Sequence, residues 1–225
     1  MQGKNASLWA AVPLVLCAAG TANAIDEKWK AEQIADALSA GPPGVTRDAR
    51  VYAWDADGRM ILLRHADGPY ACVASGNTST RVGKPPLPYP DPMCLDQNAW
   101  RFFQVLWSEK NPMQPSRPYP TAPGLVWMLA GMGLGEGMVK IGSSGDAEVA
   151  VAKSGQKIAR ISPHVMIMPF PVDEKTSGME SNYDPSRPEA SWVMFAGTPI
   201  EHVMVHFSEQ AVRSMMETGP DSKTE

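Results

Sequence analysis

The chain has 225 residues, of which 44% are hydrophobic and 20% are charged, and its formal net charge is −4 at pH 7. Lysine and arginine are not concentrated in any stretch, so the basic surface of nucleic-acid-binding or anionic-membrane-binding proteins is not predicted. The length and the hydrophobic content are sufficient for the core of one domain.

The first 24 residues have the features of a cleaved signal peptide. A short basic start precedes an apolar run at 7–20, and Ala22 and Ala24 form an A-x-A cleavage site. The apolar run is shorter than the roughly 20 residues of a membrane-spanning helix. We therefore predict cleavage after Ala24, a periplasmic or secreted location, and no transmembrane segment in the mature chain.

Cleavage would leave two cysteines, Cys72 and Cys94. The third, Cys17, lies in the signal segment, where Leu16 is too large for a lipoprotein cleavage motif. An even pair in an oxidising compartment predicts a disulfide, worth about 3 kcal/mol for a loop of that length. The alternative is a free Cys94 thiol at a helix N-terminus, where its pKa would fall and the thiolate could act as a nucleophile.

Two stretches, residues 26–43 and 93–110, have the periodicity of helices. The first begins at Asp26, a typical N-cap residue, and stops where glycine and proline follow. The second begins near Asp91 or at Asp96 and spaces its aromatic residues at i, i+3 and i+7. One aromatic face therefore carries Trp100, Phe103 and Trp107.

Most other apolar runs have the pattern of strands. They are 50–64 (a hairpin that turns at DADG), 69–75, 124–131, 162–170, 191–197 and 199–207. The proline-rich and glycine-rich stretches between them are expected to be loops. A helix, strands, a helix and further strands predict an α+β fold with a mainly antiparallel sheet. We expect one domain over 25–215 and a flexible tail over 216–225.

Two predicted strands are near copies of each other, HVMIMPF at 164–170 and HVMVHF at 202–207. Alternate residues of a strand share a face. If the strands are neighbours and these faces match, three imidazoles and three thioethers lie close together. They belong to His164, Met166, Met168, His202, Met204 and His206.

Imidazole and thioether ligands suit copper, above all Cu(I). A soft-metal site is therefore predicted from His164, Met166, His202, Met204 and His206. Such a site requires that His164 and His202 reach one ion. The alternative is ordinary sheet packing, in which methionine fills gaps in the core and each histidine is hydrogen-bonded separately.

Enzymatic alternatives centre on the same histidines. His202 and His206 at i and i+4 resemble the zinc-protease motif H-E-x-x-H, but Val203 stands where the catalytic glutamate would be. That class is excluded. A hydrolase-like enzyme would use His164 or His202 as the base, beside a nucleophile such as Cys94.

Several segments resemble an uncharacterised family of small exported bacterial proteins. The matching patches are GPYACV around Cys72, DPMCLD around Cys94, SPHVMIMPFP at 162–171 and WVMFAGTPIEHVMV at 192–205. The resemblance implies a protein of the bacterial envelope or a secreted protein, and it implies no activity.

The leading hypothesis is a non-enzymatic exported protein that binds a small molecule or another envelope protein. The soft-metal protein is the first alternative, and the hydrolase-like enzyme is the second. An enzyme requires a pocket with a nucleophile or a carboxylate beside a histidine. A packing role predicts instead that the histidines are hydrogen-bonded individually and lie far apart.

Overall fold

The computed structural model describes residues 26–76, 88–135, 149–151, 155, 157–170 and 177–217. The predicted signal peptide lies outside these ranges, as does the chain after 217. The helices are α1 (Glu27–Leu38), α2 (Pro43–Thr46), α3 (Gln97–Ser108) and α5 (Glu209–Glu217). Along the described part of the chain, no helix is both long enough and apolar enough to span a membrane.

The strands form two sheets. The larger has eight strands in the order β10-β11-β9-β5-β4-β3-β1-β2, and the smaller has three in the order β6-β8-β7. Their bounds are β1 (Arg50–Trp54), β2 (Met60–Arg64), β3 (Ala71–Val73), β4 (Met93–Leu95), β5 (Gly124–Met128), β6 (Met132–Gly135), β7 (Val149–Val151), β8 (Lys157–Ile161), β9 (His164–Met168), β10 (Trp192–Met194) and β11 (His202–His206). The pairing is mainly antiparallel, so the predicted α+β fold is confirmed.

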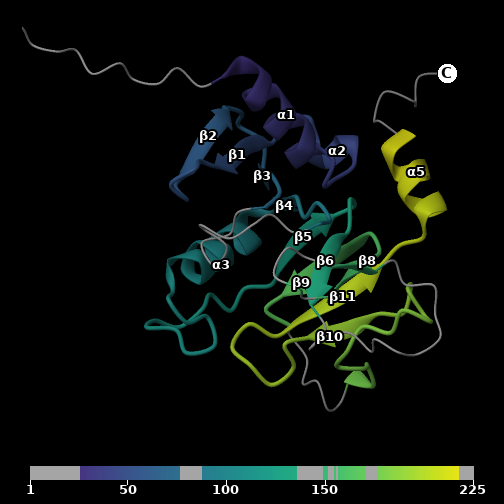
Figure 1. Cartoon of the computed structure of the whole chain (residues 1–225). Helices are drawn as coiled ribbons and strands as arrows, with labels where there is room; N and C mark the ends of the chain where they lie inside the picture. Colours follow the sequence, from purple (N-terminus) through teal and green to yellow (C-terminus); the bar gives the residue numbers. More distant parts are fainter. Residues whose placement is uncertain are drawn as a thin grey trace, which may run out of the picture.

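The strands of the larger sheet lie nearly in the order of the chain, and only the two strands at each edge are exchanged. Figure 1 shows β1 and β2 (blue) near α1 at one end, and β10 and β11 (yellow-green to yellow) at the other end. The predicted hairpin is confirmed, since β1 and β2 are antiparallel neighbours. The predicted disulfide between Cys72 and Cys94 is also confirmed, and it joins directly opposite residues of β3 and β4.

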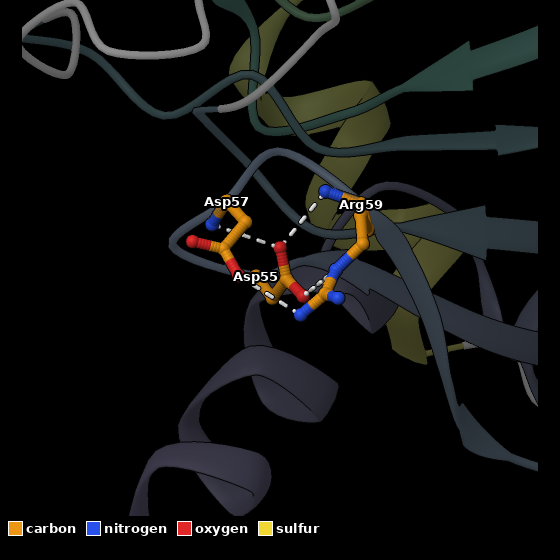
Figure 2. Close-up of polar contacts among 3 residues, drawn as sticks. All are labelled: Asp55, Asp57 and Arg59. Carbon is orange, nitrogen blue, oxygen red and sulfur yellow. Dashed lines mark hydrogen bonds and ion pairs between the residues drawn. The ribbon is translucent and has the colours of Figure 1, made fainter.

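The hairpin turn is held by one carboxylate. Asp55 Oδ1 accepts hydrogen bonds from the backbone N–H groups of Asp57 (2.9 Å) and Arg59 (2.8 Å), and the Arg59 guanidinium donates to Asp55 Oδ2 (2.8 Å) and to Asp57 Oδ2 (2.9 Å). Figure 2 shows these contacts within the turn. The bond from the Arg59 backbone is the largest of the effects that lower the pKa of Asp55. The aspartate is therefore satisfied within its own turn.

Helix α1 packs on one face of the larger sheet. Asp26 caps it as predicted, because its side chain accepts from the backbone N–H of Lys28 (2.9 Å). The buried residues under α1 are small, which lets the helix approach the sheet closely. They include Ala37, Ala40, Val51, Ala53, Cys72 and Cys94.

Helix α3 packs on the opposite face of the sheet. It begins after Asp96, whose Oδ1 accepts from the N–H of Ala99 (2.8 Å) and whose Oδ2 accepts from the N–H of Leu125 on β5 (3.0 Å). Of the two predicted starts of this helix, Asp96 is confirmed and the one near Asp91 is wrong, because 93–95 form β4 between β3 and β5. Of the predicted aromatic face only Phe103 is buried, and Phe102, at 0% exposure, lies deepest.

Two strands of the smaller sheet are joined by short connections to two strands of the larger sheet. β5 leads into β6 through 129–131, and β8 leads into β9 through Ser162 and Pro163. Gly131 has φ +76°, and a Cβ atom there would lie 2.3 Å from the carbonyl oxygen of Ile161. The glycine-rich run at 131–148 was expected to be a loop, and this is wrong for β6, because Met132–Gly135 pair with β8. Residues 136–148 lie outside the described ranges.

Candidate functional site

The two HVM strands are antiparallel neighbours in the larger sheet. His206 lies directly opposite His164, and Met204 lies opposite Met166. All four side chains are buried, in the face of the sheet that also contacts α3. The structure therefore forms the histidine–methionine layer that the repeated sequence suggests.

The antiparallel register separates two of the predicted ligands. His202 is four residues from His206 on β11, a distance of about 13 Å at the usual rise per residue of a strand. Because His164 lies across from His206, the backbones of His164 and His202 are about this far apart. In the ranges that the structure covers, no group of three or more His, Cys, Asp or Glu side chains has the geometry to hold a metal ion.

His206 is hydrogen-bonded at both ring nitrogens. The indole Nε1–H of Trp192 donates to His206 Nε2 (2.9 Å), so this nitrogen carries a lone pair. The proton of the neutral ring is then on Nδ1, which lies 2.8 Å from Ser162 Oγ, and the Ser162 hydroxyl donates to the carbonyl of Pro188 (2.6 Å). The lone pair and the proton of His206 both take part in hydrogen bonds. Neither ring nitrogen is therefore available to a metal ion, and the ring cannot remove the proton of Ser162.

His164 and His202 are held in a different way. The Nδ1–H of His164 donates to the carbonyl of Ser162 (2.8 Å), and the Nδ1–H of His202 donates to the carbonyl of Ile200 (2.8 Å). In each case the acceptor is two residues earlier in the chain. Each Nε2 atom is then a bare lone pair, and both are buried without a hydrogen-bond partner. Such an atom costs about 1–3 kcal/mol when it is left unpaired.

Methionines occupy the positions opposite these two histidines on the neighbouring strands. Met128 of β5 lies directly opposite His164, on the side away from His206. Met194 of β10 lies directly opposite His202, and the β9–β11 register, continued by one residue, places Met168 on its other side. Met128 and Met194 were not among the ligands predicted from the sequence. The alternation of GLVWM and WVM would have selected them only once the order of the strands was known.

Burial keeps all three of these imidazoles neutral. Desolvation is the main cause that lowers the pKa of His164 to about 3 and the pKa of His202 and of His206 to about 4. His65, the fourth histidine, is exposed after β2. The three buried rings are therefore uncharged at any pH near neutrality.

We expect the free energy of unfolding of the protein to decrease as the pH is lowered from about 6.5 to about 4. The pKa of an unfolded histidine is about 6.5, above the folded values of His164, His202 and His206, so in this window the unfolded state binds more protons and the free energy of unfolding decreases. Urea unfolding at a series of pH values measures this slope. The slope should be smaller in His164→Phe than in the parent chain, and a flat profile for the parent chain would contradict the expectation.

The cysteine alternative is excluded by the disulfide. Cys94 is bonded to Cys72, is fully buried, and lies on β4 rather than at the start of a helix. It is therefore neither a thiolate nor accessible to a substrate.

Comparisons of the chain with family models, with curated proteins and with solved structures found no match. The resemblance to small exported bacterial proteins therefore stays a prediction.

Proposed function

We propose that this is an exported, non-enzymatic protein that binds a soft monovalent metal ion, Cu(I) or its analogue Ag(I), at His164. The observation that carries the proposal is the buried, unpartnered Nε2 atom of His164, a residue flanked on the same face of the sheet by Met128 and Met166. One imidazole nitrogen and two thioethers form a neutral, soft set of ligands. The proposal joins the leading hypothesis of a binding module to its soft-metal alternative.

The hydrogen bond at the far side of the ring supports this role. Histidines that bind metals usually donate the other ring N–H to a carbonyl or a carboxylate, which fixes both the tautomer and the orientation of the ring. The bond from His164 Nδ1 to the carbonyl of Ser162 (2.8 Å) has this form. Ser162 and Pro163 join β8 to β9 at the corner between the two sheets, so this carbonyl belongs to a constrained segment.

The neutral imidazole and thioether groups at His164 favour an ion that is monovalent and soft. A buried divalent ion with only neutral ligands would be strongly disfavoured, because a charge of two would remain uncompensated in the core. A monovalent ion carries the smallest such cost, and Cu(I) accepts thioether ligands. Protons do not compete near neutral pH, because burial lowers the pKa of His164 to about 3.

Export is supported by two observations. Residues 1–24 have the pattern of a cleaved signal peptide, and the Cys72–Cys94 disulfide is of the kind that persists in oxidising compartments. A disulfide also removes both cysteines of the mature chain as competing thiolate ligands. Metal binding then depends on imidazole and thioether groups alone.

The test is a calorimetric titration with Ag(I), on protein that a bacterial host has exported and whose first residue is expected to be Ile25. Ag(I) replaces Cu(I) because it needs no reductant, which would break the disulfide. We expect His164→Phe to lose one equivalent of bound Ag(I). Met166→Leu, which keeps the volume of the side chain, should weaken that equivalent by about tenfold or more.

Matched controls separate ligation from folding. His65→Phe and Met113→Leu change an exposed histidine and an exposed methionine, and both should bind Ag(I) as the parent chain does. Thermal unfolding of each variant shows whether it is folded. If His164→Phe does not fold, Met166→Leu and Met128→Leu decide the question. A folded parent chain that binds no Ag(I), or a Met166→Leu variant that binds it equally well, would refute the proposal.

A further inference from the structure

His202 has the same local geometry as His164, at a separate place in the sheet. Its Nδ1–H donates to the carbonyl of Ile200 (2.8 Å), and its Nε2 atom is buried without a partner. The side chain is 4% exposed. The tautomer fixed by Ile200 leaves a buried Nε2 lone pair without a partner, and this indicates a ligand at this nitrogen.

The turn before β11 fixes the ring of His202. Within this turn the N–H of Thr198 donates to the carbonyl of Phe195 (3.1 Å), and the N–H of Glu201 donates to the carbonyl of Thr198 (3.1 Å). The Glu201 carboxylate accepts from the backbone N–H of Gly197 (2.5 Å), so it is used inside the turn and is not a ligand in the layer. The carbonyl of Ile200 is thereby held in place beside His202.

The residues next to His202 in the sheet are methionines, and one aromatic ring lies close to the imidazole. Met194 lies directly opposite on β10, Met168 follows from the register on β9, and Met204 is the next residue on the same face of β11. The centroid of the Phe195 ring lies 5.9 Å from that of the imidazole. No charged side chain belongs to this set, so it is again suited to a soft monovalent ion rather than to a divalent one.

We infer that His202, with Met168 and Met194, binds a second soft monovalent ion, about 13 Å from the site at His164. The inference rests on the proposed function, since both sites use the same ligand chemistry. The five residues that the sequence suggests for one metal site are thus divided by the antiparallel register. His164 and His202 become ligands of different ions, and His206, bonded to Trp192 and Ser162, is a ligand of neither.

The stoichiometry of Ag(I) binding tests this inference. The parent chain should bind two equivalents, and His202→Phe and His164→Phe should each bind one. Met194→Leu should weaken only the equivalent that His202→Phe removes. Met179→Leu, a change of an exposed methionine on the segment before β10, serves as the matched control.

The outcomes distinguish this inference from the proposed function. A parent chain that binds one equivalent, lost in His164→Phe and kept in His202→Phe, overturns the second site only. One equivalent lost in His202→Phe and kept in His164→Phe overturns the proposal for His164 and supports the site at His202. A folded parent chain without bound Ag(I) overturns both. If His202→Phe does not fold, equal binding by Met194→Leu and the parent chain overturns the second site.

Discussion

Replacing Gly124 with alanine is expected to destabilise the protein by about 3 kcal/mol or more. Gly124 begins β5 directly under the first turn of α3. A Cβ atom there would lie 2.1 Å from the backbone nitrogen of Ala99, 2.7 Å from its Cα and 2.8 Å from the carbonyl carbon of Asn98. These are backbone atoms of a capped helix, so they cannot move aside as a flexible side chain would.

Urea unfolding of Gly124→Ala against the parent chain measures the effect. Gly44→Ala is the matched control, because a Cβ atom at Gly44 in α2 would meet nothing within 4 Å. In a helix this exchange is neutral or stabilising by up to about 1 kcal/mol. An unfolding midpoint of Gly124→Ala equal to that of the parent chain would show that α3 does not contact β5 as described.

Loss of the disulfide is the second large effect that we expect. Cys72 and Cys94 are 22 residues apart, and closing a loop of that size stabilises a fold by about 3 kcal/mol in the chain-entropy model. The double variant Cys72→Ala/Cys94→Ala avoids leaving a free thiol. Its free energy of unfolding should be lower by about this amount.

A reductant provides the control for the disulfide. It should shift the unfolding transition of the parent chain toward that of the double variant and leave the double variant unchanged. If the parent chain and the double variant unfold at the same urea concentration, β3 and β4 are held by their backbone ladder and by packing alone, and the disulfide contributes little.

Local signals in the sequence predicted those parts of the fold that depend on nearby residues. Asp26 caps α1 through its own first turn, and the turn at DADG closes between adjacent strands. Both features need only a few consecutive residues. The start of the second helix stayed open between Asp91 and Asp96, because 93–95 join a sheet whose other strands are far away in the chain.

The candidate site was predicted only in part, because the positions of its residues depend both on local strand geometry and on the pairing of distant strands. The alternation in HVMIM and HVMVH assigned the correct residues to one face, since this depends only on the geometry of a strand. Which histidines lie opposite each other depends on the register of β9 and β11. The partner that satisfies His206, the indole of Trp192, comes from a third strand. No local pattern distinguishes a satisfied histidine from the unpartnered His164 and His202.

The order of the strands has a consequence for how the sheet is assembled. Each of β2, β3, β4, β5 and β9 pairs with a strand that precedes it in the chain, and β10 and β11 join at the end as a hairpin. No strand has to be inserted between two that are already paired. The sheet can therefore grow in one direction, from the N-terminal part toward the C-terminal part. A chain that is synthesised from its N-terminus presents its strands in this same order.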